Sequence, residues 1–256
     1  EEFMLIANKK VAELFSEIKK QKYIYRVHDL PDNEKLKSLK HIVKSFGYTL
    51  DLTSSKGISK SLNKLLYQIK GKEEQNLIES LALRSMSKAE YSTNNIGHYG
   101  LAFENYTHFT SPIRRYPDVL VHRLLQDILD KNYGSMDKNL QKKATHCSEQ
   151  ENNAIKAERE SVKFMQIKFM QNKIGESFNG IISGVSDWGI YVELEENKCE
   201  GMVYVKDIKD DKYYYSSEEA SLIGKKNNKK FQLGDSITVE VKNADLIKKH
   251  LDFIII

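Results

Sequence analysis

The sequence predicts an α+β protein in two parts, a largely helical part over residues 1–174 and a small β-barrel over residues 175–256. In the first part, apolar residues recur at steps of three and four, which is the spacing of one helix face. The last 82 residues hold seven of the 13 glycines and none of the three prolines, and there apolar and polar residues alternate as in strands. We therefore place a domain boundary near residue 174.

Four helices are predicted before residue 92, each from one apolar face. The faces are Met4, Ala7, Val11, Leu14 and Ile18; Leu36, Leu39, Val43 and Phe46; Ile58, Leu62, Leu65 and Ile69; and Leu77, Ile78, Leu81 and Met86. Gly47 and Gly71 follow the second and third faces, where a glycine suits a helix C-cap. Residues 92–112 lose this period, and we expect loop and strand there.

Pro117 fits the first turn of a further helix. The run SEQE at 148–151 matches a capping box and predicts that a long helix begins there and extends to about residue 173. Residues 190–194 and 237–241 alternate between apolar and polar side chains, so both are predicted strands. Several short strands within about 80 residues favour a small barrel.

The composition argues against a membrane protein. No run approaches the ~18 apolar residues of a membrane span, so no membrane partner is expected. Cys147 and Cys199 are the only cysteines and lack metal-ligand spacing, which favours a reducing compartment, the cytoplasm. Because the chain starts at Glu1 within a helical pattern and stops within an apolar run, we expect it to be part of a longer protein.

Charge is divided unevenly between the two parts. Residues 175–256 hold 11 lysines and no arginine against 15 acidic residues, a net charge of −4. The whole chain is +4, so residues 1–174 carry +8. A basic field suits a polyanion such as nucleic acid, and a solvated lysine-rich surface is the alternative interpretation.

One segment, HFTSPIRRYPDVLVHR at 108–123, stands out chemically. Two adjacent arginines lie between Pro112 and Pro117, which restrict the backbone on both sides. Arginine grips phosphate through paired hydrogen bonds, and fixed geometry favours such a contact. Adjacent residues of an extended segment face opposite ways, so we expect one arginine to meet a ligand and the other to brace the fold. A structural ion pair is the alternative to an anion site.

The longer run GHYGLAFENYTHFTSPIRRYPDVLVHR, residues 97–123, closely resembles the signature of the catalytic domain of the ribonuclease II/ribonuclease R family, and it matches the ribonuclease R branch better. The blocks EEFMLIANKKVA, YRVHDLP, LRSMSKAEY and AERESVKF resemble other parts of that domain. The run FNGIISGVSDWGIYVEL and the segments after it resemble an S1 RNA-binding domain, a five-stranded OB-fold barrel. The resemblance covers nearly the whole chain.

This resemblance implies part of a processive, Mg²⁺-dependent 3′-to-5′ exoribonuclease that releases nucleoside 5′-monophosphates. In the family, Mg²⁺ is held by aspartates in the first half of the catalytic domain, which is absent here. We therefore expect no metal ligands in this chain, and we interpret Asp210 and Asp211 as solvated charges. The expected partners are single-stranded RNA and the missing N-terminal part of the same enzyme. The alternatives are a non-catalytic RNA-binding module and, less well supported, a helical scaffold.

Three residues of the helical part are candidates by resemblance. Arg114 is expected to be catalytic, contacting a phosphate near the scissile bond. Arg115 is a candidate RNA contact whose alternative role is an ion pair, and Glu158 is a candidate near the RNA path whose alternative is a surface salt bridge. Arg26 and His28 are weaker candidates for the RNA channel. The nearby histidines lack metal-ligand spacing and are expected to be structural; they are His98, His108 and His122.

Four aromatic residues of the barrel fall where S1 domains stack nucleic-acid bases, namely Phe178, Trp188, Tyr191 and Tyr204. For Tyr191 the alternation gives independent support, because its neighbours are expected to point into the core. For Phe178 and Trp188 a place in the core is the alternative. The net negative charge of this part requires a local basic patch for RNA binding, and KKNNKK at 225–230 is the candidate, with a solvated loop as its alternative.

Overall fold

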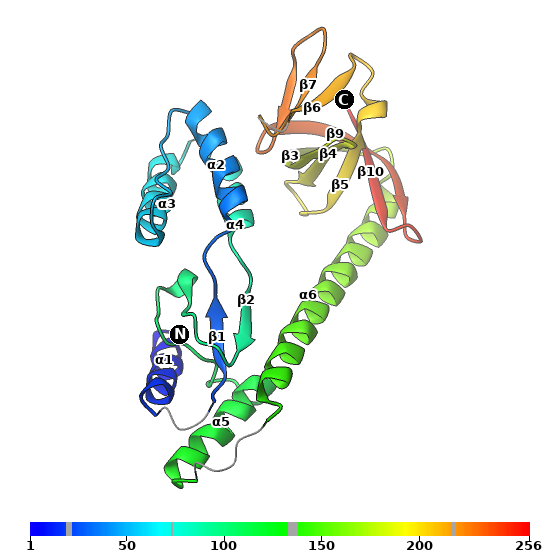
Figure 1. Ribbon diagram of the computed structural model, residues 1–256. Helices are drawn as coiled ribbons and strands as arrows, with labels where there is room; N and C mark the ends of the chain where they lie inside the picture. The colour runs from blue at the N-terminus through cyan, green and yellow to red at the C-terminus, as the bar shows by residue number, and fades with distance from the viewer. Residues whose placement is uncertain (19–21, 73, 133–137, 217–218) are drawn as a thin grey trace. The chain divides into compact units, whose positions relative to one another are not determined.

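The computed structural model describes residues 1–18, 22–72, 74–132, 138–216 and 219–256. The chain divides into two compact units (Figure 1). Unit 1 comprises Glu1–Pro31 and Met86–Lys156, and unit 2 comprises Asp32–Ser85 and Ala157–Ile256. The predicted α+β class is correct.

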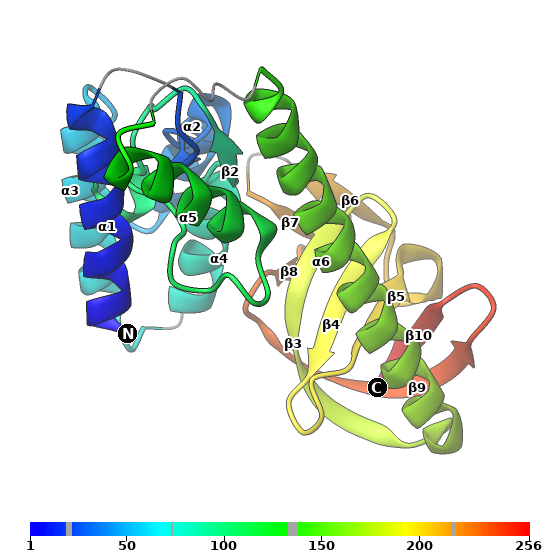
Figure 2. The ribbon, with the colours of Figure 1, turned by 90° about the horizontal axis from the view of Figure 1, so that it is seen from below.

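Unit 1 packs helices against a short two-stranded sheet. Its elements are α1 (Glu2–Glu17), β1 (Tyr25–His28), β2 (Ala89–Ser92), η1 (Tyr99–Leu101), α5 (Tyr116–Leu129) and the first part of α6 (Leu140–Met170). β1 pairs with β2 in antiparallel register, with Tyr25 opposite Ser92. The core draws apolar side chains from α1, β1, β2, α5 and the start of α6. Figure 2 shows α5 lying next to α1.

Unit 2 contains α-helices that precede the barrel, the second part of α6 and the strands from β3 to β10. The helices before the barrel are α2 (Asn33–Ser45), α3 (Ser55–Ile69) and α4 (Gln75–Ser85). After α6 come η2 (Gln171–Lys173), β3 (Ser177–Ser186), β4 (Gly189–Leu194), β5 (Glu200–Tyr204), η3 (Val205–Asp207), β6 (Tyr213–Ser216), β7 (Ser221–Gly224), β8 (Lys230–Gln232), β9 (Ser236–Asp245) and β10 (His250–Ile255).

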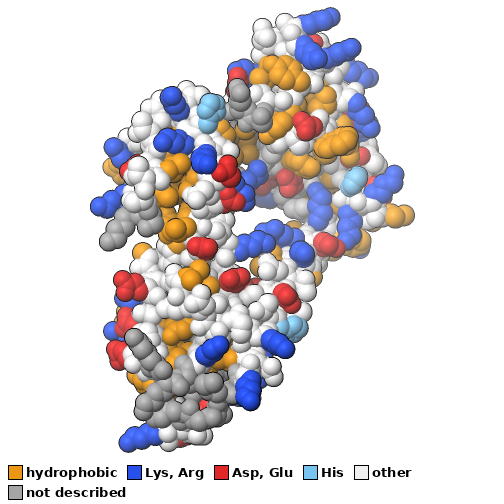
Figure 3. Space-filling model, viewed as in Figure 1, with side chains coloured by type: hydrophobic (Ala, Val, Ile, Leu, Met, Phe, Trp, Pro, Cys, Tyr) orange, Lys and Arg blue, Asp and Glu red, His pale blue; other side chains and the backbone are white. Residues whose placement is uncertain are grey.

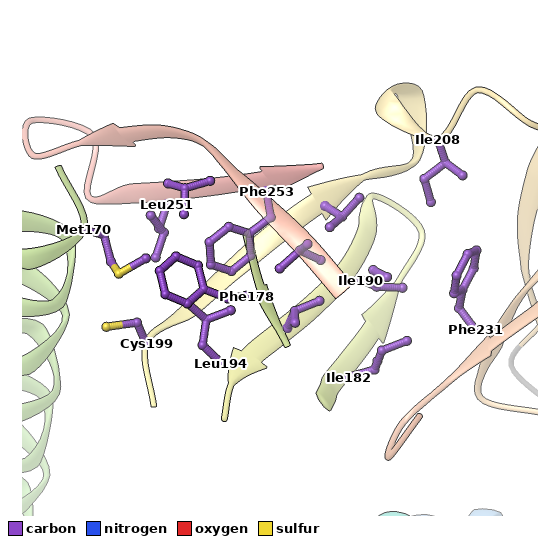
Figure 4. Packing of buried hydrophobic residues seen from close by; sticks show 14 of the residues in the cluster. Met170, Phe178, Ile182, Ile190, Leu194, Cys199, Ile208, Phe231, Leu251 and Phe253 are labelled. Atoms are coloured by element: carbon purple, nitrogen blue, oxygen red, sulfur yellow. The ribbon is translucent and has the colours of Figure 1, made fainter. Parts of the chain in front are cut away.

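Five strands close into the predicted barrel, in the order β10-β5-β4-β3-β9. All pairs are antiparallel except β10 with β5. Inward side chains such as Ile182, Ile190 and Phe253 are fully buried and fill the interior (Figure 4). Strands β6, β7 and β8 form a separate antiparallel sheet inserted between β5 and β9.

The end of α6 is attached to the barrel. Ile167 and Met170 are fully buried in the barrel's core cluster, and Met170 is at its edge in Figure 4. On the next turns, Lys163 Nζ donates to the Glu200 carbonyl and Gln166 Nε2 donates to the Lys198 carbonyl at 2.9 Å. These bonds connect α6 to the backbone at the start of β5 and just before it.

Most predicted helix faces are confirmed. The apolar sets of α2 and α3 are buried apart from Phe46, and Gly47 and Gly71 have positive φ angles of 81° and 77° just past those helices. Pro117 lies in the first turn of α5, as predicted. The face of α1 was predicted wrongly, because its buried residues are Asn8, Ala12 and Phe15.

The predicted start of the long helix is also wrong. α6 begins at Leu140, so Ser148 lies in its third turn and does not cap it. Ser148 Oγ donates to the Ala144 carbonyl at 3.1 Å and accepts from the Tyr91 amide at 2.8 Å. The hydroxyl therefore links the helix to β2, a role that the local capping pattern does not encode.

None of the helices in the described ranges combines the length and the apolar character needed to cross a lipid bilayer.

Candidate nucleic-acid interface

The segment before the two arginines is fixed at three points in unit 1. Thr107 Oγ1 donates to the Ile24 carbonyl at 2.7 Å. Asn8 of α1 is buried, and its Oδ1 accepts the amides of Phe109 at 2.9 Å and Thr110 at 3.2 Å. Asn8 Nδ2 donates to the Tyr106 hydroxyl at 3.1 Å. A polar side chain at the buried face of a helix thus serves as the anchor of a distant loop.

The first turn of α5 fixes the other end of this segment. Asp118 is 0% exposed, and its Oδ1 accepts the Ser111 amide at 2.8 Å and Arg115 Nη2 at 2.7 Å. His122 stacks on Phe109 with ring centroids 4.1 Å apart, and its Nε2 donates to the Phe109 carbonyl at 2.9 Å. The loop around the arginines is therefore held from α1 and from α5.

This arrangement separates the two arginines by role. Arg115 is the N-cap residue of α5 and is bound to the buried Asp118 carboxylate, so the structure supports the bracing role over a direct RNA contact. The Arg114 side chain is exposed, and among the described residues its guanidinium makes a single long hydrogen bond of 3.4 Å, to Ser111 Oγ. Arg114 therefore keeps most of its five donors for a ligand.

Arg114 opens on a cleft of about 530 Å³ between the start of α5 and one face of α6. The α5 side contributes the segment from Arg114 to Pro117, and the α6 side contributes residues such as His146, Gln150 and Glu151. The N-terminal end of α5 carries partial positive charge, which adds to that of Arg114. The cleft can therefore accept an anion at the Arg114 end.

Arg26 and His28 take part in internal contacts. Arg26 Nη1 and Nη2 donate to the Glu151 carboxylate at 2.7 and 3.1 Å, and the guanidinium lies over the Tyr91 ring at 4.6 Å. His28 Nδ1 accepts the Gly100 amide at 2.9 Å while Nε2 lies 2.7 Å from the Ser87 carbonyl. These contacts favour structural roles over a place in an RNA channel.

The three other histidines of this region also bond within the fold. Besides the His122 contact, His98 Nδ1 accepts the Leu101 amide at 3.2 Å, and His108 Nδ1 lies 2.8 Å from the Tyr91 hydroxyl. Burial lowers the pKa of His98 to about 4 and the pKa of His108 to about 3. Both rings are therefore neutral at pH 7, and the hydrogen bonds within the fold are those expected of structural histidines.

Within the described ranges, no three or more His, Cys, Asp or Glu side chains come together as a metal-binding group would require. Asp211 is not a simple solvated charge, which corrects the prediction. Its carboxylate accepts the backbone amides of Lys212, Lys226 and Asn227 at 2.6 to 2.9 Å, and these bonds lower its pKa. Asp211 thus organises the turn between β7 and β8.

Tyr191 and Tyr204 lie on the outer face of the barrel. Tyr191 is 41% exposed, whereas Ile190 and Val192 on either side are buried, so the predicted alternation is confirmed. Tyr204 pairs with Gly189 and Met202 pairs with Tyr191, which places both tyrosines on the same face of β4 and β5. Trp188 just before β4 is 76% exposed. Tyr204 is half-buried, and Lys206 Nζ lies over its ring at 4.8 Å from the centroid. Tyr191 and Trp188 are therefore the more accessible rings.

Phe178 differs from these three aromatic residues. It is 8% exposed and belongs to the barrel core, where Figure 4 shows its ring beside Phe253. A base cannot stack on a ring that is covered on its faces, so its predicted RNA contact is replaced by a packing role. Closure of the barrel by β9, whose Val239 pairs with Phe178, accounts for this burial.

Glu158 is exposed on α6, and within the described ranges it has no ion-pair partner. The salt bridge, which was the alternative interpretation, is therefore not observed among these residues, and an RNA contact of Glu158 stays a prediction. Sequence reasoning missed Asn8 and Asp118 as anchors. For Asn8, the available signal was a polar residue directly after Ala7 of the predicted apolar face. For Asp118, it was an aspartate three residues after Arg115.

Comparison with known proteins identifies the class. The RNB domain family matches residues 1–131, and the S1 RNA binding domain family matches residues 171–255. The chain belongs to the RNB domain family.

The similar proteins are named ribonuclease R. Ribonuclease R of Aquifex aeolicus is 40% identical over 256 residues, covering 99% of this chain and 36% of that protein. The structure of Mycoplasma genitalium RNase R in complex with ribose-methylated single-stranded RNA superposes with a TM-score of 0.87 at 31% identity, over 99% of this chain and 40% of that one. Yeast Ssd1, a pseudonuclease, shares the fold at a TM-score of 0.68 and 24% identity, over 86% of this chain and 28% of that one. This chain thus spans about a third of the length of the curated relatives it matches.

Proposed function

We propose that this chain is part of a processive 3′-to-5′ exoribonuclease that hydrolyses single-stranded RNA to nucleoside 5′-monophosphates in the cytoplasm. Residues 1–174 would form part of its catalytic domain, and residues 175–256 would form its S1-type RNA-binding domain. The observation that carries the proposal is Arg114, an exposed guanidinium on a loop held from two helices. The similarity to ribonuclease R supports the activity.

Arg114 is assigned the catalytic role in this chain. In phosphodiester hydrolysis, negative charge grows on the non-bridging oxygens, and a fork of donors already in place binds that charge without reorganisation. Asn8 and Asp118 supply the fixed geometry, because they accept the amides of Thr110 and of Ser111, the residues that lead into the arginine segment. Arg115 contributes by holding Asp118 and so the start of α5.

The barrel is assigned the binding role. Tyr191 and Tyr204 share an outer face, and Trp188 is exposed next to it. Bases of any sequence can stack on such rings, which suits an enzyme that moves along RNA. Glu158 is proposed to lie near the RNA path, on the strength of the resemblance alone.

The proposed cofactor is Mg²⁺, which in this reaction class activates water and neutralises charge on the leaving oxygen. The described residues do not fit such a site, since they bring no three candidate ligands together. The ligands are therefore proposed to lie in the part of the longer enzyme that precedes this chain, which is also its proposed partner.

A non-catalytic, single-stranded RNA-binding module is the second candidate. It is favoured by the fold shared with Ssd1, a pseudonuclease, because this fold also occurs without nuclease activity. Arg114 would then serve as a phosphate contact only.

The full-length protein, expressed from its whole gene, tests the two candidates. With Mg²⁺, 5′-labelled RNA is expected to shorten progressively and 3′-labelled RNA to release its label as a mononucleotide, and EDTA is expected to stop both. Binding of the same RNA without any shortening, in Mg²⁺ and in Mn²⁺, would establish the non-catalytic module instead.

A further inference from the structure

The three-stranded sheet β6-β7-β8 presents one face that combines lysines with an exposed ring. Tyr214 pairs with Ile223, which in turn pairs with Lys230, so these side chains share a face. The Lys225 amide donates to the Lys212 carbonyl at 3.0 Å, which continues the ladder by one pair and places these two lysines on the same face. Tyr214 is 47% exposed.

The opposite face of this sheet is occupied. Tyr213, Leu222 and Phe231 are buried and belong to the barrel's core cluster. The sheet is thus anchored on one side. On the other side Ile223 of the middle strand is also buried, whereas Tyr214 and the lysines around it are exposed, namely Lys212, Lys225 and Lys230. Figure 3 shows Lys and Arg side chains gathered at the end of the molecule where Figure 1 draws β6 and β7.

Charge in the barrel part is concentrated in this insertion. Residues 209–230 hold six of the 11 lysines of residues 175–256 and four of the 15 acidic residues, a net charge of +2. The remaining residues of that part then carry −6. A polyanion that approaches this domain is therefore attracted to the insertion and repelled by most of the rest.

Two of these six lysines form ion pairs within the described part of the chain. Lys229 lies 3.9 Å from Asp210, and Lys230 lies 2.5 Å from Glu219. In the described part of the chain, Lys212 and Lys225 form no ion pair. The Asp211 carboxylate next to them is bound to three backbone amides of the turn, which stiffens the turn that carries Lys225.

We propose that this face is a second RNA-contacting surface, in which Lys212 and Lys225 bind phosphates and Tyr214 stacks a base. The inference rests on the proposed function and adds a site separate from Tyr191 and Tyr204. Its occupant is single-stranded RNA, because the spacing of lysines and a ring suits a flexible strand whose bases are unpaired.

Fluorescence anisotropy tests the proposal with the 256-residue chain and a labelled oligouridine of about 20 nucleotides, longer than the ~4–16 nucleotides that one OB-fold covers. Lys212→Gln/Lys225→Gln is expected to reduce the slope of log affinity against log salt by about 1.4, from ~0.7 per phosphate contact. Tyr214→Ala is expected to raise Kd about fivefold or more, and Tyr214→Phe to leave it unchanged.

The matched control is Lys60→Gln/Lys64→Gln/Tyr67→Ala, which removes the same side chains from the exposed face of α3. It is expected to leave both Kd and the salt slope unchanged. Equal effects from the control and the sheet variants would overturn the proposal, since they would indicate diffuse charge. If Tyr191→Ala weakens binding and the sheet variants do not, the second surface is excluded while the proposed function stands. An unmodified chain that binds no RNA overturns both.

Discussion

Replacing Asn8 by alanine tests whether the arginine loop is held from α1. The change removes the acceptor of two backbone amides, those of Phe109 and Thr110, and the donor to the Tyr106 hydroxyl. An amide left without a partner costs ~1–3 kcal/mol when buried and less where water reaches it. Phe109 and Thr110 are half-buried, so the expected loss in the free energy of unfolding is ~2–4 kcal/mol.

Two further variants show how much of this loss in the free energy of unfolding comes from each bond of Asn8. Tyr106→Phe removes only the bond from Asn8 Nδ2, so it is expected to cost ~1 kcal/mol. Asn63→Ala on α3 removes an exposed asparagine from a helix and is expected to stay within ~0.5 kcal/mol of the unmodified chain. The assay is urea unfolding followed by circular dichroism.

Amide exchange measured by mass spectrometry localises the effect. In Asn8→Ala, peptides covering residues 106–115 are expected to exchange faster, whereas barrel peptides keep their rates, because the broken bonds lie in unit 1. If Asn8→Ala unfolds with the same free energy as the unmodified chain and those peptides exchange unchanged, then Asn8 does not hold the loop.

In the full-length enzyme, Arg114→Lys is expected to lower kcat about 10²–10³-fold, because it keeps the charge and loses the fork of donors; normal turnover with weakened RNA binding would contradict the catalytic role. Tyr191→Ala is expected to weaken single-stranded RNA binding by ~1–3 kcal/mol while leaving Tm nearly unchanged, and a large drop in Tm would mean that the ring is part of the core. Residues 1–256 alone are expected to bind RNA with an affinity that falls as salt rises, and to release no mononucleotides in Mg²⁺ or Mn²⁺, with an Arg114→Ala control against contaminating nuclease. Burial lowers the pKa of His98 to about 4 and that of His108 to about 3, below the 6.5 of an unperturbed histidine. The unfolded chain therefore binds more protons below pH ~6.5, and stability is expected to fall from pH 7 to pH 5, by ~2 kcal/mol for the more buried His108 and by less for His98, which solvent screens. Equal urea midpoints at the two pH values would refute this.

Helices and strands were predictable from the sequence wherever an element buries a single apolar face. The apolar sets of α2 and α3 are buried as expected, because their spacing matches the helix period directly. The pattern failed in α1, where the polar Asn8 is buried and Met4 is exposed. Asn8 can be buried because its side chain bonds to the amides of Phe109 and Thr110. These partners lie about a hundred residues away in the sequence, so no local pattern indicates them.

Local motifs were less reliable than periodicity. The run at 148–151 has the residues of a capping box, yet α6 continues through it. Ser148 does not cap the helix, because its hydroxyl bonds to the Ala144 carbonyl and to the Tyr91 amide of a neighbouring strand. A capping box describes what a serine can do at a free helix end. Whether a helix begins at that serine depends on how the residues before it pack.

By itself, the sequence was sufficient for the family, the five-stranded barrel and the outward direction of Tyr191, because long motifs and strand alternation are local properties of the chain. Only the tertiary structure decided which arginine is available and which aromatic ring is covered. Arg114 and Arg115 are chemically identical neighbours, and they differ because the buried Asp118 binds only Arg115. Phe178 and Tyr191 are both aromatic residues on barrel strands, and they differ because barrel closure brings β9 and β10 over the inward face alone.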